Sequence, residues 1–289
     1  MVARRPRFGA ARAFLLARQV GTAKRLPEHP VFRGIVTTRE TTGLLALRVD
    51  ESDSDASGWK RTALTFAFGA LQWPWLAISL LGGTRKSKLR LLDRLDLPVD
   101  ALPNLGSWKA DCAFLHHLVD AIEDLRPAHV VELGSGASSL VIARALQRNG
   151  GGSLTSFDQH AKFVEEMPGW LAQHGLGAEF VHAPLADHRD GAPGPWYSLQ
   201  HLPDAIDMLV IDGPPWAVHP LIRGRAEVLF DRVVPGGIVL MDDANRPGER
   251  IVARRWRRAW PEFSFLRDRR GTKGTLLGRR QGLGALPAE

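Results

Sequence analysis

Five acidic residues lie at or near the ends of short apolar runs: Glu132, Asp158, Asp212, Asp242 and Asp243. Carboxylates accept hydrogen bonds from sugar hydroxyls, bind hard cations and take protons from nucleophiles. If the runs form neighbouring strands of a parallel sheet, these side chains gather at its carboxyl edge, where ligands bind. The spacing therefore predicts one crevice in which a ligand lies close to several carboxylates.

A glycine turn, Gly134-Ser135-Gly136, separates the apolar run 130–133 from an apolar pattern at helical spacing. A strand that passes through such a turn into a helix brings its backbone close to a nucleotide-like ligand. A phosphate, a dinucleotide and S-adenosylmethionine compete for this place. The chain lacks the Gly-Lys-Ser/Thr of a phosphate-binding loop, and Ser139 stands where the dinucleotide fingerprint has its third small residue. Because a lone Gly-x-Gly is weak evidence, the flanking elements must decide.

The elements that position these residues alternate between two patterns from about residue 110 onward. Apolar runs predict strands, and helical periodicity predicts helices between them. The expected strands are 129–134, 153–158, 178–185, 206–213, 236–243, 262–268 and 271–280, and the expected helices are 111–127, 138–149, 162–175, 219–233 and 249–260. The alternation predicts a doubly wound α/β fold with a mostly parallel sheet. The last two strands are joined by a short turn, so they must form an antiparallel hairpin.

From about residue 110 to 280 the sequence resembles the class I S-adenosylmethionine-dependent methyltransferases. The resemblance rests on "VVELGSGAS", "SLTSFD", "DMLVIDGPP" and "VPGGIVLMDD", followed by the closing hairpin. "IDGPP" and "LMDDANR" are most similar to a broad bacterial subgroup of methyltransferase domains. The resemblance implies a Rossmann-like, seven-stranded sheet and S-adenosylmethionine as the cofactor.

The resemblance also assigns roles to residues of the predicted crevice. Its cofactor-binding set is Glu132, Gly134, Ser135, Gly136, Asp158, Ala183, Pro184 and Asp212. The glycines let the methionyl end of the cofactor lie against the backbone, and Asp158 can accept hydrogen bonds from both ribose hydroxyls. Two plainer interpretations stay open: Asp158 caps the following helix, and Glu132 only supports the turn.

The acceptor side of the crevice is expected to hold Asp212, Asp243 and His219 as catalytic residues. Asp212, Asp242 and Asp243 repel one another unless a cation or proton intervenes, and the group resembles the magnesium site of metal-dependent O-methyltransferases. Asn245 lies two residues beyond an Asp-Asn pair, so the ligand set stays open. The alternative without a metal makes Asp212 a wall of the acceptor pocket and Asp242 or Asp243 a helix cap.

Charge is distributed unevenly along the chain, whose formal net charge is +7. Residues 1–27 carry seven basic and no acidic residues, and residues 246–289 carry twelve basic and four acidic residues. The middle of the chain is acidic, which speaks against nucleic acid as the partner, although the basic aromatic stretch 253–260 keeps that alternative open. The single cysteine, Cys112, excludes an intramolecular disulfide, and a reducing cytoplasm is expected.

The N-terminal part, residues 1–100, is expected to be an extension to a methyltransferase domain at 101–289. It opens with a basic stretch that predicts an amphipathic helix, and residues 62–83 form an uncharged, mostly apolar segment of 22 residues. Burial in a small subdomain is the first interpretation of this segment. Lying on a membrane surface through residues 1–90, or crossing the membrane, are the alternatives.

The sequence thus predicts a methyltransferase that acts on an oxygen or nitrogen of a small-molecule or glycan-type acceptor, with an O-methyltransferase favoured. The alternatives are a nucleic-acid methyltransferase and a non-catalytic, membrane-attached scaffold.

Overall fold

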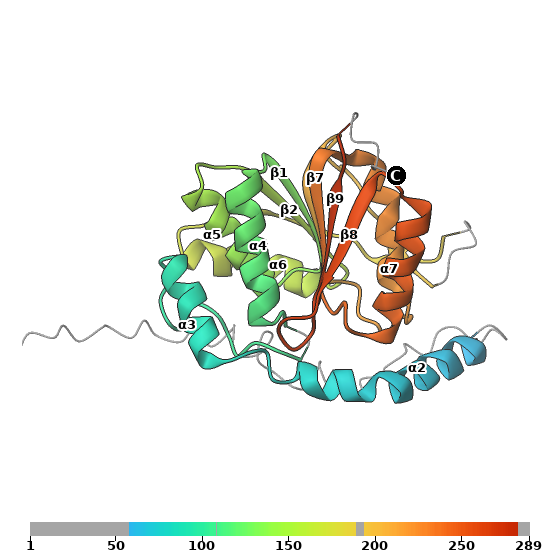
Figure 1. The fold of residues 1–289 in the computed structure, drawn as a ribbon. Coiled ribbons are helices and arrows are strands. Elements are labelled where there is room, and N and C mark those ends of the chain that lie inside the picture. The colour runs from blue at the N-terminus through green and yellow to red at the C-terminus, as the bar shows by residue number, and fades with distance from the viewer. Residues whose placement is uncertain (1–57, 108, 189–193, 283–289) are drawn as a thin grey trace, which may run out of the picture.

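The computed structural model describes residues 58–107, 109–188 and 194–282, and its centre is a seven-stranded sheet (Figure 1). The strand order is β3-β2-β1-β6-β7-β9-β8. The strands are β1 (His129–Leu133), β2 (Ser153–Asp158), β3 (Glu179–His182), β6 (Ile206–Ile211), β7 (Val233–Met241), β8 (Phe263–Asp268) and β9 (Thr275–Arg280). The pairs from β3 to β7 are parallel, and β9 lies antiparallel between β7 and β8. The predicted doubly wound sheet with a terminal antiparallel hairpin is confirmed.

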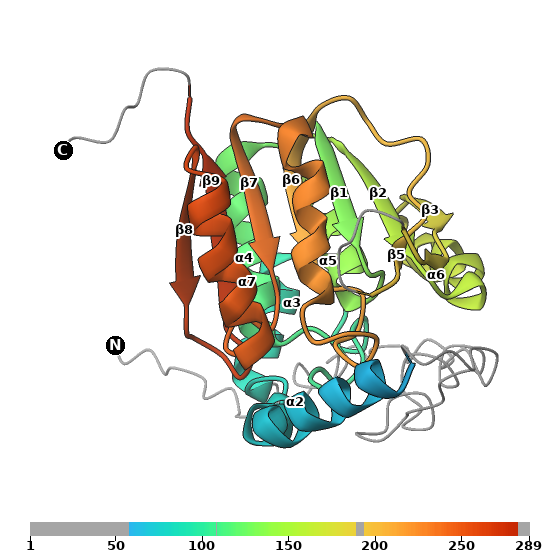
Figure 2. The same ribbon diagram turned by 90° about the vertical axis from the view of Figure 1, so that its right-hand side faces the viewer.

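Helices cover both faces of the sheet, because alternate residues of each strand point to opposite sides (Figure 2). On β1, Val130 packs into one core and Val131 into the other. The first core lies under α3 (Arg85–Arg94), α4 (Cys112–Leu125), α5 (Ala137–Arg148) and α6 (Ala161–Gln173). The second lies under α7 (Pro247–Ala259) and the 3-10 helix η2 (Ile222–Arg232).

Two elements differ from the sequence-based expectation. The strand expected at 178–185 ends at His182, since Pro184 has no amide hydrogen to continue the ladder; β4 (Leu185–Ala186) then pairs antiparallel with β5 (Trp196–Tyr197). The helix expected at 219–233 is the 3-10 helix η2. In η2 the Gly224 carbonyl accepts a hydrogen bond from the Trp256 indole at 3.2 Å, which is a bond outside the helix.

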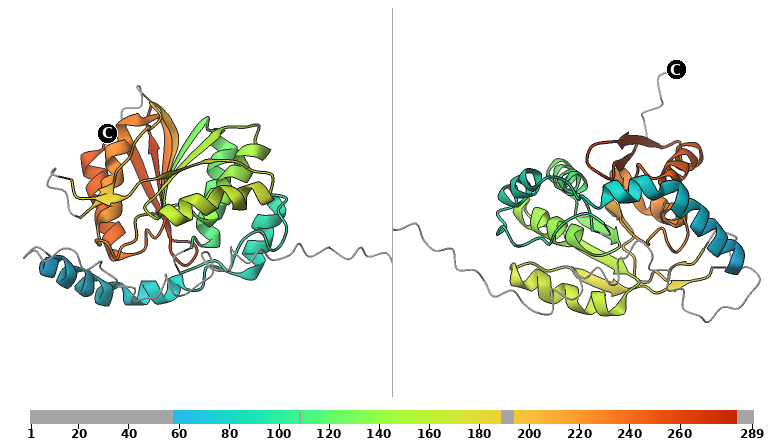
Figure 3. Two further views of the ribbon diagram at one scale, coloured as in Figure 1. Left: turned by 180° about the vertical axis from the view of Figure 1, so that it is seen from behind. Right: turned by 90° about the horizontal axis from the view of Figure 1, so that it is seen from below.

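The helix α2 (Gly58–Ser79) crosses the carboxyl edge of the sheet, as Figures 1 and 2 show from two sides and Figure 3 from below. It lies against the loop after β6, where a Cβ on Gly69 would meet the Trp216 ring at 3.2 Å. At its end the backbones of Gly82 and Gly106 come so close that neither position has room for a side chain. No helix in the described part of the chain is long and apolar enough to cross a membrane.

The helix α3 belongs to the first core. Leu91, Leu92 and Leu95 are buried there together with α4 and α5, and Arg144 donates to the Leu95 carbonyl at 2.8 Å. Part of the expected N-terminal extension, from residue 85 to 100, therefore packs against the sheet domain. The basic stretch at residues 1–27 lies outside the described residues.

Candidate functional site

The glycine turn between β1 and α5 is shaped by a close backbone crossing. Gly134 has φ +94°, a region that favours glycine, and a Cβ there would lie 2.7 Å from the Gly213 nitrogen. Gly213 in turn donates to the Leu133 carbonyl at 2.7 Å, which joins the ends of β1 and β6. A Cβ on Gly136 would meet no atom within 4 Å, so the turn opens onto free space at the start of α5.

Glu132 is buried beneath this turn and is bound through one oxygen. Its Oε2 accepts from Ser139 Oγ at 2.5 Å and from Ser156 Oγ at 2.6 Å, whereas Oε1 has no hydrogen-bond partner. Burial raises the pKa of Glu132 to about 7, although the neighbouring serine hydroxyls lower it in part. Of these, Ser139 and Ser156 bond to Oε2, whereas Ser138 Oγ is buried near the carboxyl group without forming a hydrogen bond. Ser139 also accepts from the Gly136 amide at 3.0 Å, so the expected support of the turn is present.

Asp158 ends β2 beside the turn and uses both carboxylate oxygens. Oδ2 accepts from the Ser135 amide at 2.9 Å, and Oδ1 accepts from the His160 amide at 2.8 Å at the start of α6. The N-cap of α6 is His160, so Asp158 does not cap the helix; one of its bonds holds the backbone just before α6, and the other fixes the glycine turn. Each oxygen retains a lone pair, so the carboxylate can still receive a ribose hydroxyl.

Ala183 and Pro184 follow β3, and the short β4–β5 pair brings Tyr197 to the same crevice. Ala183 is buried and donates to the Asp158 carbonyl at 2.9 Å, whereas Pro184 is exposed. Tyr197 is buried with its hydroxyl unpaired, and a Cβ on Gly213 would clash with that oxygen at 2.3 Å. Burial and the Asp158 charge raise the pKa of Tyr197 well above its usual value.

The three aspartates at the ends of β6 and β7 come together as expected. Ligand oxygens of Asp212, Asp242 and Asp243 lie within 4.8 Å of one another. Asp212 is partly accessible, whereas Asp242 and Asp243 are buried. Parallel strands that end at one edge of the sheet account for this convergence.

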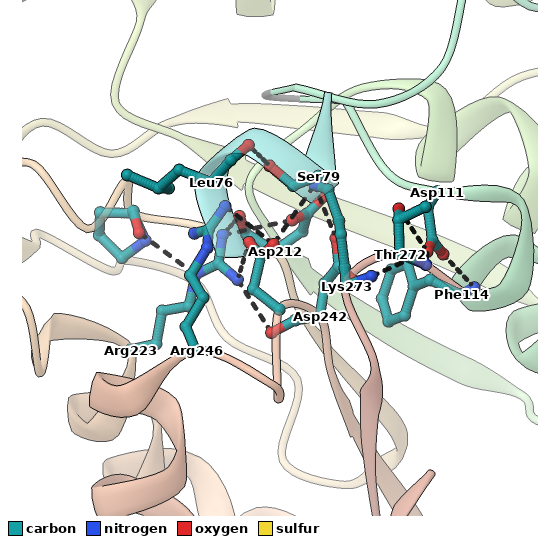
Figure 4. Close-up of polar contacts among 12 residues, drawn as sticks. Leu76, Ser79, Asp111, Phe114, Asp212, Arg223, Asp242, Arg246, Thr272 and Lys273 are labelled. Carbon is teal, nitrogen blue, oxygen red and sulfur yellow. Dashed lines mark hydrogen bonds and ion pairs between the residues drawn. The ribbon is translucent and has the colours of Figure 1, made fainter. Parts of the chain in front are cut away.

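Three buried cations, which sequence reasoning missed, surround these carboxylates (Figure 4). Arg223 of η2 reaches Asp243 at 2.9 Å and Asp212 at 3.3 Å. Arg246 reaches Asp243 at 2.9 Å. Lys273, in the turn between β8 and β9, lies 3.2 Å from Asp242 and 3.5 Å from Asp243. The sequence carries no signal for this, because the three cations come from separate segments with no motif.

Burial and the cations shift the pKa values of these carboxyl groups in opposite directions. Burial raises the pKa of Asp242 well above its usual value despite Lys273. Burial alone would raise the pKa of Asp243, but Arg246, Lys273 and Arg223 outweigh it, and the pKa lies well below its usual value. For Asp212, burial dominates and raises the pKa despite Arg223. The pKa of Lys273, which burial would lower, is raised by Asp242 and Asp243. A fourth buried carboxyl group, Glu249 on α7, has its pKa raised by burial.

Lys273 is held in place by the cap of α4. Asp111 Oδ1 accepts from the Phe114 amide at 2.9 Å, as a helix N-cap does. Its Oδ2 accepts from the amides of Thr272 and Lys273 at 2.6 and 3.1 Å. One carboxylate therefore fixes both the start of α4 and the turn that carries the lysine (Figure 4).

These residues do not fit a divalent metal as they stand. Arg223, Arg246 and Lys273 already contact the three carboxyl groups, so a metal ion would have to displace Lys273 or Arg223 from its partners. Asn245, considered as a further ligand, packs its amide against Gly274. Magnesium at this cluster stays a prediction, and the ion pairs of the aspartates with Arg223, Arg246 and Lys273 speak against it.

His219 and the stretch 253–260 were the remaining candidates. His219 is buried; its Nδ1 accepts from the Leu221 amide at 3.2 Å, which leaves the ring hydrogen on Nε2. Trp256 is fully buried against Phe230, so its ring cannot stack on a nucleic-acid base.

Residues 131–244 match the family model described as a methyltransferase domain. No curated protein sequence matches the chain. The solved structures similar to it include the O-methyltransferase TomG of Streptomyces achromogenes (18% identity, 73% of this chain and 99% of that one, TM-score 0.44). An O-methyltransferase of Bacillus cereus is 15% identical over 75% of this chain and all of that one, with a TM-score of 0.47. A methyltransferase of Geobacter sulfurreducens is 19% identical over 68% and 88%, with a TM-score of 0.44.

Proposed function

We propose that this chain, which carries a methyltransferase domain at residues 131–244, moves the methyl group of S-adenosylmethionine to an oxygen atom of a small-molecule or glycan-type acceptor. The cofactor supplies an activated methyl group on its sulfonium. The protein's main task is then to hold acceptor and methyl group in line, and its second task is to take the acceptor's proton.

The observation that carries this proposal is the unpaired polar lining beside the glycine turn. Glu132 Oε1 and the Tyr197 hydroxyl are buried and lack a hydrogen-bond partner, although buried polar atoms are normally paired. An amino-acid moiety against Gly134 and Gly136 would place an ammonium group near Glu132. A ribose near Asp158 would complete the cofactor's contacts.

On the acceptor side, Asp212 is our candidate for contact with the acceptor hydroxyl. It lies at the end of β6, is more accessible than Asp242 and Asp243, and its pKa is raised, as suits a base. Asp243 is a weak base because its pKa is far below neutral. In this proposal Asp243 positions Arg223 and Lys273. The acceptor nitrogen of His219 is occupied by the Leu221 amide, so His219 takes no part in the proposed proton transfer.

The proposed transfer uses no divalent metal, because Lys273, Arg223 and Arg246 already supply positive charge at the aspartates. The cations also keep Asp243 ionised without a metal ion.

Calorimetry with S-adenosylhomocysteine tests the cofactor site. Asp158→Ala removes charge-assisted hydrogen bonds and should cost about 1.5–3 kcal/mol of affinity. Asp231→Ala, an exposed aspartate, is the matched control and should bind normally. Equal affinity of all three proteins would place the ribose elsewhere.

The reaction itself is tested with labelled cofactor and a panel of hydroxyl and amine acceptors, with RNA and DNA as further arms. Transfer to an oxygen that falls about 100-fold or more in Asp212→Asn supports the proposal. Transfer to nucleic acid alone, or tight cofactor binding without any transfer, would replace it with one of the two alternatives.

A further inference from the structure

The helix α2 buries three polar residues beside Leu76 and exposes several large apolar ones. Thr65, Gln72 and Ser79 recur every seven residues, which is close to two helical turns, and all three are buried toward the sheet domain. The next position in this repeat holds Phe66 and Trp73, which are exposed. An ordinary surface helix has the opposite arrangement, with its apolar side toward the core.

The outer face of α2 comprises Phe66, Leu71, Trp73 and Ile78, which are 54%, 59%, 63% and 50% exposed. Ala63, Ala67, Ala70 and Pro74 are also exposed on this helix, and no charged residue occurs from 63 to 79. Beyond the helix, Leu80 and Leu81 are exposed too. A continuous apolar face of this length marks a contact with another apolar medium.

Basic residues lie on both sides of this face. Just after α2, Arg85, Lys86 and Arg90 of α3 are exposed. On the other side, α7 begins and β8 ends at the same carboxyl edge of the sheet, and α2 contacts α7 there. Arg250, in the first turn of α7, and Arg267 and Arg269, at the end of β8, lie toward this edge, and Arg254 and Arg257 follow along α7. Burial and the charges of Arg250 and Arg269 lower the pKa of Arg267, which reflects how densely these cations lie.

We propose that the outer face of α2 lies on a membrane surface that carries anionic lipid headgroups. Apolar side chains with an interfacial tryptophan would enter the boundary between headgroups and acyl chains, while the flanking arginines and lysine would contact the phosphates. In this proposal the helix lies in the plane of the membrane.

A second copy of the chain fits this face less well. Two-fold pairing through α2 would bring the basic residues of α3 or α7 of one copy toward basic residues of the other, and like charges at an interface are costly. An anionic membrane removes that repulsion.

The test is co-sedimentation of the full chain with vesicles of phosphatidylcholine, alone or with phosphatidylglycerol. The natural protein should bind the mixed vesicles, bind neutral ones less, and lose binding in high salt. Combined Phe66→Ser, Leu71→Ser, Trp73→Ser and Ile78→Ser should weaken binding at least about tenfold. Val99→Ser with Val228→Ser, exposed apolar residues outside α2, is the matched control and should leave binding unchanged.

Two further variants separate the contributions. Trp73→Glu alone should also weaken binding. This variant tests the outer face of α2 if the fourfold variant does not fold. Arg250→Glu with Arg269→Glu should reduce the preference for anionic vesicles. Thermal melting and S-adenosylhomocysteine affinity report whether each variant is folded.

Failure of the natural protein to bind either vesicle type would overturn the proposal. Undiminished binding by the folded α2 variants would do so as well. If sedimentation velocity without vesicles shows a dimer that the α2 variants dissociate, the occupant of the outer face is a second copy. None of these outcomes bears on cofactor binding, which calorimetry measures separately.

Discussion

At the scale of single residues, Glu132 links the fold of the glycine turn to ligand binding. One of its oxygens is used by Ser139 and Ser156, and the other is unpaired. With a pKa of about 7, the group is half ionised near neutral pH. A ligand cation beside it would favour the ionised form and release the remaining proton.

Cofactor affinity should therefore rise with pH around neutrality. Below the pKa of about 7 the cation must displace the Glu132 proton, so the affinity for S-adenosylhomocysteine should increase by up to about tenfold per pH unit there and level off above it. Calorimetry between about pH 5.5 and 8.5 measures this slope. Glu132→Gln should bind more weakly with a flat profile, and an unchanged slope in that variant would assign the titration to another group.

Lys273 is the most completely buried of the three cations that contact the aspartates. Lys273→Met leaves Asp242 without its partner and should lower the free energy of unfolding by about 3–5 kcal/mol in urea titration. Arg279→Met, an exposed cation on β9, should change little. Adding Asp242→Asn to Lys273→Met should restore part of the loss, and no restoration would mean that packing of the lysine, not its charge, is what stabilises the fold.

Turnover should not depend on a divalent metal. Dialysis against EDTA should leave the methylation rate unchanged, and added Mg²⁺ should not raise the melting temperature. The reason is that Arg223, Arg246 and Lys273 already form ion pairs with the aspartates. A rate that falls with EDTA and returns with Mg²⁺ would show that the cations move aside for a metal.

At the scale of elements, Asp111 couples two parts of the chain that lie far apart in sequence. Asp111→Ala removes the cap of α4 and three hydrogen bonds to the β8–β9 turn, including one from the Thr272 hydroxyl at 3.0 Å. The expected loss is about 2–4 kcal/mol of stability. Thr84→Ala, which removes only the exposed cap of α3, should cost about 1 kcal/mol or less. Equal losses in the two variants would argue against the coupling.

The elements were largely predictable from sequence, and the reasons are local. Apolar runs and helical periodicity are properties of short windows, so the strands of the sheet and the positions of Asp158, Asp212, Asp242 and Asp243 at its edge follow from them. The cations that pair with these carboxylates could not be predicted from such short windows. Lys273 reaches Asp242 only because β9 inserts beside β7, and nothing in the segment "GTKG" marks its lysine as buried.

The burial of polar residues and exposure of apolar residues on α2 could not be predicted from the sequence either. Three polar residues of its uncharged part recur every seven positions, a pattern that would ordinarily place them toward solvent. That Thr65, Gln72 and Ser79 are buried together with Leu76 follows only from where the helix packs in the folded chain.

At the scale of the whole molecule, the position of the N-terminal boundary can be tested by truncation. A chain starting at residue 101 loses Leu91, Leu92 and Leu95, which are almost completely buried, and should aggregate or melt without cooperativity. A chain starting at residue 84 keeps α3 and should unfold cooperatively. Size-exclusion chromatography and calorimetric melting distinguish the two, and a stable, cofactor-binding chain from residue 101 would show that α3 is dispensable.

The pairing of Asp242 with Lys273 spans 31 residues, and it has a consequence for how the chain folds. A ribosome releases β1 to β7 first, and at that moment the carboxylates at the end of β7 lack their lysine. Burying them then would cost more free energy than the strand pairing returns. The edge of the sheet beside β7 should therefore stay unpaired until the β8–β9 hairpin has emerged and docked through Asp111. Docking of the hairpin is then the last step of folding, and it depends on contacts between residues far apart in the sequence.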